Sequence, residues 1–263
     1  MNNSQSKQAN TQPYILSETT WKKVKETDYD LVVLPWSATE PHNLHLPYGT
    51  DTIETTAIAR QAASIAWAKD AKVAVLPIIP FGTNTGQIDL KLTINLNPST
   101  QMLILKDIVR SICMQGFRRF CILNGHGGND FQQMIRELNL EFPEVFICQV
   151  SWFKMAAAQN LFENPGDHAD EMETSLMMHI APQHTLPLSE AGSGATRTFR
   201  INAFHEGWAR APRKWTQIST DTGSGDPSKA SAEKGKRCFE IITERIAQLF
   251  IDLAGTSLNN LYE

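Results

Sequence analysis

The sequence of 263 residues lacks the features that mark secreted, membrane and nucleic-acid-binding proteins. It has four cysteines and no C-x-x-C pair, so we expect reduced core thiols rather than a disulfide framework or a thiolate zinc site. No apolar run approaches the ~18 residues of a membrane span. With 24 Lys and Arg against 28 Asp and Glu, the net charge of −4 gives no basic footprint for nucleic acid or an anionic membrane.

The first residues, MNNSQSKQANTQ, are polar and have no apolar core like that of a signal peptide. We therefore expect residues 1–12 to form a disordered tail on a cytoplasmic protein. Residues 13–263 contain no repeat, low-complexity tract or Pro/Gly/Ser linker, and their number suits one large domain.

Short β-branched runs alternate with helical patterns, which predicts βαβ units around a mostly parallel sheet. The runs LVVL, VAVLPII and FCIL are continuously apolar, as in strands that are covered on both faces. The predicted strands span residues 31–35, 73–79, 119–123 and 145–150. The predicted helices span residues 52–69, 99–115, 131–141, 170–180 and 227–253. Asp226 is the expected cap of the last helix, with Pro227 in its first turn. Residues 186–225 are expected to form long loops and short strands near a site.

Residues 34–52, LPWSATEPHNLHLPYGTDT, hold an unusual group of ionisable side chains between a strand and a helix. Open α/β sheets bind ligands in this position, beyond the carboxyl end of a strand. Glu40 and His42 point to the same side of an extended segment, and His45 and Asp51 follow them. An ordinary polar loop ending in a helix cap at Asp51 explains this segment alone about as well as a metal site does.

A second segment, RRFCILNGHGGNDFQQ, runs from a buried strand through a glycine-rich turn into a helix. The glycines allow a sharp turn or a close approach to a ligand. His126 falls at the same edge of the sheet as the first cluster. Such turns can also cradle a phosphate, but neither G-x-G-x-x-G nor G-x-x-x-x-G-K-[ST] is present, so nucleotide binding is not expected.

A third segment, GDHADEMETSLMMHIAP, predicts a helix with a carboxylate in its apolar stripe. The stripe consists of Ala169, Met172, Glu173, Leu176, Met177 and Ile180. A carboxylate that faces a core needs a partner. We favour a metal for Glu173, with a salt bridge to a buried arginine as the alternative. Asp167 and His168, just before the helix, are candidate proton-transfer groups. Three other histidines are read as ordinary residues: His179, His184 and His205.

These residue types suit one particular chemistry. Zinc and manganese accept carboxylate and imidazole ligands together. Five such ligands, one of them a bridging carboxylate, would support two metals about 3.5–4 Å apart.

Together the segments resemble the creatininase (creatinine amidohydrolase) family from about residue 14 to residue 253. The matching pieces are EPH at 40–42, HLPYGTD ending at Asp51, NGHGGN at 124–129, HADEMETS at 168–175, and GDP at 225–227 followed by AEKG at 232–235. The resemblance implies a three-layer α/β/α sandwich and a site for two divalent ions, Zn or Mn. It also implies hydrolysis of a C–N amide bond in a small, often cyclic substrate by a homo-oligomer, often a hexamer.

By position, the resemblance makes Glu40, Asp51 and His126 ligands of one metal. His42 and Asp51 become ligands of the other, with Asp51 bridging. In creatininase proper a glutamate two residues after the histidine completes the second site. That position is Gly128 here.

Glu173 is our candidate for the missing ligand, because of its place on the apolar stripe. His168 matches the family's catalytic histidine and Asp167 its acidic partner, while Trp152 stands for the aromatic residue that covers the substrate. Two further stretches depart from the family pattern, EPHN at 40–43 and NTGQIDL at 84–90, so creatinine itself is not the expected substrate.

The resulting hypothesis is a metal-dependent amidohydrolase in which the two metals activate a bridging water. The metals and the Gly127–Gly128 backbone would stabilise the oxyanion, and His168, oriented by Asp167, would move the proton. A formamide deformylase or peptide-processing hydrolase of the same family is the alternative within this chemistry. A non-catalytic metal-binding homologue is the alternative from another class.

Overall fold

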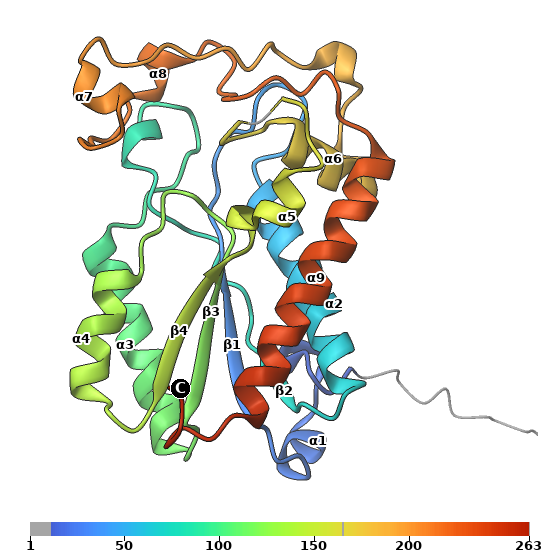
Figure 1. Ribbon diagram of the computed structural model, residues 1–263, viewed down its shortest axis with the longest axis vertical. Coiled ribbons are helices and arrows are strands. Elements are labelled where there is room, and N and C mark those ends of the chain that lie inside the picture. Colours follow the sequence, from blue (N-terminus) through green and yellow to red (C-terminus); the bar gives the residue numbers. More distant parts are fainter. Residues whose placement is uncertain (1–11, 165, 263) are drawn as a thin grey trace, which may run out of the picture.

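The computed structural model describes residues 12–164 and 166–262 and is built around a parallel sheet with helices on both faces (Figure 1). The strands are β1 (Leu31–Trp36), β2 (Val73–Val75), β3 (Arg119–Asn124) and β4 (Phe146–Ser151), in the order β2-β1-β3-β4. Each neighbouring pair is parallel. The predicted three-layer α/β/α architecture is confirmed. The predicted tail lies outside the described residues, apart from residue 12.

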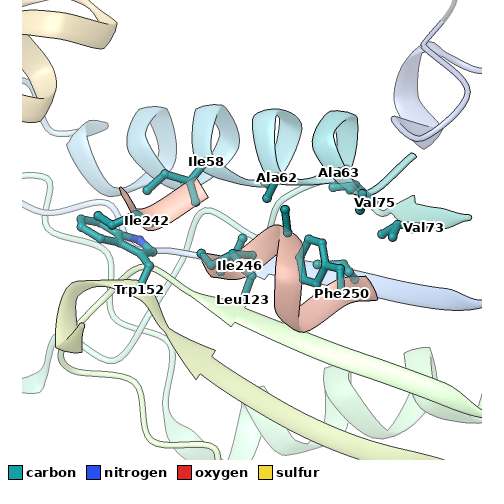
Figure 2. Packing of buried hydrophobic residues seen from close by; sticks show 14 of the residues in the cluster. Ile58, Ala62, Ala63, Val73, Val75, Leu123, Trp152, Ile242, Ile246 and Phe250 are labelled. Carbon is teal, nitrogen blue, oxygen red and sulfur yellow. The ribbon is translucent and has the colours of Figure 1, made fainter. Parts of the chain in front are cut away.

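One face of the sheet packs against α2 (Thr50–Trp67) and α9 (Ala232–Gly255). Leu31 and Val33 of β1 point to this face because side chains alternate along a strand. Figure 2 shows Ile58 of α2 and Ile246 and Phe250 of α9 in this layer. Burial of each such side chain contributes roughly 1.5–3 kcal/mol relative to its exposure. Packing in this layer holds α2 against the sheet and so fixes the position of its N-terminus, which carries Asp51.

The opposite face packs against α3 (Pro98–Met114) and α4 (Gln132–Glu141). The intervening residues of β1 and β3 point here, including Val32, Leu34, Phe120 and Ile122. Because both faces are covered, the continuously apolar strands of the sequence are explained.

The remaining elements are short and lie mostly at the carboxyl end of the sheet, apart from α1 and η1 (Figure 1). They are η1 (Leu16–Glu18), α1 (Trp21–Lys25), η2 (Thr85–Gln87), η3 (Trp152–Lys154), α5 (Ala156–Gln159), α6 (Glu171–Ile180), η4 (Pro182–His184), η5 (Leu188–Glu190), α7 (Asn202–His205) and α8 (Trp215–Ile218). None of the described helices has the length and hydropathy that crossing a bilayer requires. All four cysteines are free.

Three predicted elements differ from the structure. The strand predicted over 73–79 ends at Val75, because Pro77 cannot donate to a ladder. The last helix begins at Ala232, so the predicted cap at Asp226 is wrong. Ser231 caps it instead by accepting a hydrogen bond from the Lys234 N–H. The segment 186–225 forms short helices rather than the predicted short strands in the part of the chain described.

Candidate metal centre

The candidate site lies at the carboxyl ends of two adjacent strands. Trp36 and Asn124 are paired at the ends of β1 and β3, so the loops that follow them begin side by side. The loop after β1 provides Glu40 and His42, and the loop after β3 provides His126. The sequence correctly predicts that these segments meet at one edge of the sheet.

Two helix N-termini supply the other candidate ligands. Asp51 lies in the first turn of α2 and Glu173 in the first turn of α6. His168 lies just before α6, where a backbone bridge joins it to Ser224. Ala169 adopts a left-handed backbone conformation with φ of 48°, and its N–H donates to the Glu173 carboxylate. This turn therefore holds Glu173 toward the interior.

Glu40, Asp51 and His126 form one compact group of possible metal ligands, and all three are buried. The His126 Nδ1 atom is 2.8 Å from Glu40 Oε1 and 3.1 Å from Asp51 Oδ2. Despite that short distance, Asp51 Oδ2 accepts no hydrogen bond of acceptable geometry among the described residues. A buried carboxylate oxygen of this kind is costly unless a cation satisfies it. The donor set therefore fits a divalent ion such as zinc or manganese.

His42, Asp51 and Glu173 form a second group. The His42 Nε2 atom is 2.9 Å from Asp51 Oδ1 and 4.0 Å from Glu173 Oε2. Asp51 thus presents Oδ2 to the first group and Oδ1 to the second. This is the arrangement that a carboxylate bridging two metals requires.

Backbone carbonyls fix the orientation of three imidazole rings. A carbonyl oxygen can only accept, so the ring nitrogen that faces it must carry the proton. The three pairs are His42 Nδ1 with Glu40 O at 3.0 Å, His126 Nε2 with Thr83 O at 3.1 Å, and His168 Nε2 with Pro41 O at 2.8 Å. The opposite nitrogen of each ring is left facing the carboxylates, as in histidines that ligate metals.

Burial and charge perturb these groups strongly. Burial alone would lower the pKa of His42, but the adjacent Asp51, with Glu173 and Glu40, raises that pKa to about 10. Burial alone would also lower the pKa of His126, but Glu40 and Asp51 raise that pKa well above its usual value. Without metal, protons on these two rings balance the carboxylates. A divalent ion would displace those protons, so metal binding is coupled to proton release.

The pKa values of His168 and Glu173 are shifted in directions that differ from those of the other histidines and carboxylates of the site. Burial and the neighbouring His42 lower the pKa of His168, so this imidazole is neutral near pH 7 and able to accept a proton. Burial raises the pKa of Glu173 to about 8, with Asp51 and Asp170 adding to the effect against the opposing charge of His42. In the metal-free site Glu173 therefore retains its proton to a higher pH than an exposed glutamate does.

The glycine-rich turn after β3 closes one side of the site. A Cβ atom on Gly128 would overlap the Thr83 carbonyl oxygen and the His126 ring. The position at which the resemblance places a glutamate ligand therefore has no room for a side chain. Gly127 is unobstructed, and both glycines line a cavity of about 630 Å³ that also exposes Glu40, His168 and Glu173.

The expected contact between Asp167 and His168 is wrong. The Asp167 carboxylate turns outward and pairs with Arg213 at 2.8 Å, and among the described residues it makes no ion pair with the His168 ring. The Pro41 carbonyl orients that ring instead. Side chains of adjacent residues in an irregular turn need not point the same way, so the sequence could not predict the direction of the Asp167 side chain.

The predicted role of Trp152 over the substrate also fails. Trp152 is fully buried, its Nε1 donates to Thr55 Oγ1 at 3.3 Å, and it belongs to the core layer of α2 and α9 (Figure 2). The next residue, Phe153, lines the cavity. Trp215 also lines the cavity, and its ring centre lies 4.8 Å from that of His168.

Two buried polar residues were missed. Gln87 donates from Nε2 to Oε2 of the Glu40 carboxylate, and this hydrogen bond fixes the orientation of that ligand. Glu54, one turn after Asp51 on α2, is fully buried and neither of its carboxylate oxygens has a hydrogen-bond partner among the described residues. Burial, with nearby Glu173, Asp51 and Asp170, raises its pKa well above the usual value, which favours the protonated form. The sequence did contain a signal for Glu54, because it follows Asp51 by three residues and so lies on the same face of the α2 helix.

Comparison with known proteins identifies the family of this chain. The family model for creatininase, described as creatinine amidohydrolase, matches residues 17–250. The chain belongs to the creatininase family. A creatinine amidohydrolase of Pseudomonas putida is 26% identical, covering 88% of this chain and 94% of that protein. A mycofactocin precursor peptide peptidase of Mycobacterium tuberculosis is 27% identical and covers 81% of each chain.

Solved structures of the family share the fold. A Bacteroides fragilis protein provisionally described as a creatinine amidohydrolase is 44% identical, with a TM-score of 0.89 over 95% of this chain and 99% of that one. A Zn-Zn creatininase and a Mn creatininase, 22% and 23% identical, each have a TM-score of 0.76 over 92% of this chain and 99% of theirs. The creatininase family thus includes structures with divalent metals of both kinds.

Proposed function

We propose that this creatininase-family protein is a dinuclear metal-dependent amidohydrolase that cleaves a C–N amide bond in a small substrate. The observation that carries the proposal is the position of Asp51, whose two oxygens face two separate groups of ligands. Glu40 and His126 would complete one site, and His42 and Glu173 the other. Zinc and manganese are the proposed ions.

When bound, the two cations would acidify a water molecule and polarise the carbonyl of the substrate. The protein contributes the remaining functions. His168, neutral and held by Pro41, takes up a proton at Nδ1 and delivers it to the leaving nitrogen. The Gly127 N–H, in the open part of the cavity wall, is placed to stabilise negative charge on the carbonyl oxygen. Trp215, packed edge-on against His168, excludes water from one side of that ring.

A screen of the metal-loaded protein tests this proposal. The substrates are creatinine, other cyclic amides, formamides and short peptides, and the readout is release of the amine. The variant His126→Ala should lose both turnover and metal. Full activity and full metal content in that variant would refute the mechanism.

Peptide processing is the second candidate, because mycofactocin precursor peptide peptidases are similar to this chain over four fifths of its length. The same screen separates the two: cleavage confined to peptides would favour this candidate, and cleavage of formamides a deformylase. A protein that binds metal but cleaves none of these classes would favour a non-catalytic homologue.

We also propose that the protein is a cytoplasmic homo-oligomer, such as a hexamer. Large apolar side chains are strongly exposed on α3 and α4, among them Leu103, Met114 and Leu140. Light scattering after gel filtration measures the oligomer size. A monomer would contradict this part of the proposal.

A further inference from the structure

We propose that the substrate carries a free carboxylate, which Arg213 binds at the mouth of the cavity opposite the metal ligands. The inference rests on the proposed hydrolase function and adds the substrate class. Arg213 belongs to the segment 186–225, in which the sequence shows no clear pattern, and it lines the same cavity as Glu40, Asp51 and His168.

The position of the guanidinium relative to the reacting groups is well defined. Its central carbon lies 5.0 Å from the ring centre of Trp215, and that ring centre is 4.8 Å from the ring centre of His168. The guanidinium carbon is thus at most about 10 Å from the centre of the His168 ring. One small molecule can span this distance, with its amide carbonyl at the metal ligands and its carboxylate at Arg213.

The backbone that presents Arg213 is anchored. A Cβ atom on Gly86 would overlap the Arg213 carbonyl oxygen, so the two chains lie in close contact there. Thr216 Oγ1 donates to Asp89 at 2.7 Å, and Lys214 Nζ lies 3.7 Å from the same carboxylate. These contacts hold the segment around Arg213 against η2. The cation–π contact with Trp215 then restricts the side chain itself.

The guanidinium retains capacity for a ligand. Its ion pair among the described residues is with Asp167, through one terminal nitrogen. The two side chains are 37% and 54% exposed, and exposed pairs of this kind contribute little stability. A guanidinium has five N–H donors in a planar fork that matches a carboxylate. The Asp167 carboxylate therefore occupies part of the place that a substrate carboxylate would take.

The charge of the cavity is polarised in the same direction. Glu40 and Asp51, which would hold cations, are buried, while the exposed Lys154 and the partly exposed Arg213, with Asp167 beside it, line the same cavity. An anionic group is therefore favoured at the mouth. A neutral amide would provide no anionic group for the remaining donors of Arg213 or for the Lys154 ammonium.

Two matched sets of hydroxamates test the proposal, because a hydroxamate binds metals directly and needs no turnover. The first set comprises the monohydroxamates of succinic, glutaric and adipic acid, which carry a terminal carboxylate. The second comprises butyro-, valero- and hexanohydroxamate, which do not. Titration calorimetry on the zinc-loaded protein measures the Kd of each.

At least one carboxylate probe should bind about tenfold more tightly than its neutral counterpart, as expected for hydrogen bonds to a charged group. Arg213→Gln should abolish that advantage and leave the neutral probe unaffected. Asp167→Ala should increase the advantage, because the competing carboxylate is removed. Arg210→Gln is the matched control, since Arg210 is exposed in the same segment and does not line the cavity.

Equal affinity of the two sets, or an advantage that survives Arg213→Gln, would overturn the carboxylate site. Failure of both sets to bind would instead overturn the metal centre and with it the proposed function. Thermal unfolding of each variant checks that the fold is intact. Because Lys154→Gln also removes a positive charge from the mouth, a loss confined to that variant would assign the anion to Lys154 and refute the role of Arg213.

Discussion

The metal-free protein should lose stability as the pH rises from 6.5 to 8.5. The pKa of His42 is about 10 in the folded state, against 6.5 for an unperturbed histidine. A raised pKa means that the folded state binds the proton more tightly. The stabilisation is therefore fully present below pH 6.5 and is lost as the pH approaches 10. Glu173, with its pKa raised to about 8, acts with the same sign.

The magnitude follows from the shift. Over the interval from pH 6.5 to 8.5, His42 alone would cost about 2 kcal/mol of unfolding free energy. For a chain of 263 residues that corresponds to a fall in Tm of about 4 °C. Asp51 does not contribute in this interval. Its lowered pKa gives stability that is present above its unfolded value and is lost only in acid.

The assay is thermal unfolding in EDTA at pH 6.5, 7.5 and 8.5, followed by circular dichroism. The control His42→Gln removes one titrating group and should reduce the dependence, leaving the part that comes from groups such as Glu173. Added zinc should raise Tm more at pH 8.5 than at pH 6.5, because it competes with the bound protons. A Tm of the wild-type protein in EDTA that is constant or rises with pH would refute the reasoning.

Three further predictions follow from single side chains. Trp152→Ala should lower the free energy of unfolding in urea by about 3–5 kcal/mol, because the Trp152 ring fills the core. A change near zero would contradict the core position of this ring. Ser231→Ala should cost about 1 kcal/mol through the lost cap, more than Asp226→Ala; the reverse order would restore Asp226 as the cap. Glu173→Gln should reduce bound zinc from two ions to one per chain by elemental analysis, and two retained ions would remove Glu173 from the ligands.

Much of the fold and the meeting of the candidate ligands could be predicted from the sequence. Continuous apolar runs located β1 and β3 to within one residue, since a buried parallel strand leaves this signature. Glu40 and His126 follow adjacent parallel strands, and this placement brings them together. The stripe position of Glu173 identified a carboxylate that faces the interior, with a side chain 13% exposed, because the cost of burying charge is large.

The wrong predictions concern where side chains point rather than where residues lie along the fold. Trp152 is fully buried in the core, whereas its neighbour Phe153 packs against the same core and also lines the cavity, so an error of one residue changes which aromatic side chain reaches the cavity. Asp167 adjoins His168 but turns toward Arg213. Arg213 and Trp215 reach the site from a segment without periodicity. Only tertiary contacts with η2 place them there.

The most direct test of the account is a crystal structure of the zinc- or manganese-loaded protein with anomalous scattering recorded at the metal edge. We predict two peaks joined by Asp51, one among Glu40, Asp51 and His126 and the other among His42, Asp51 and Glu173. A single peak, or peaks away from Asp51, would contradict the central claim that this carboxylate bridges two metals.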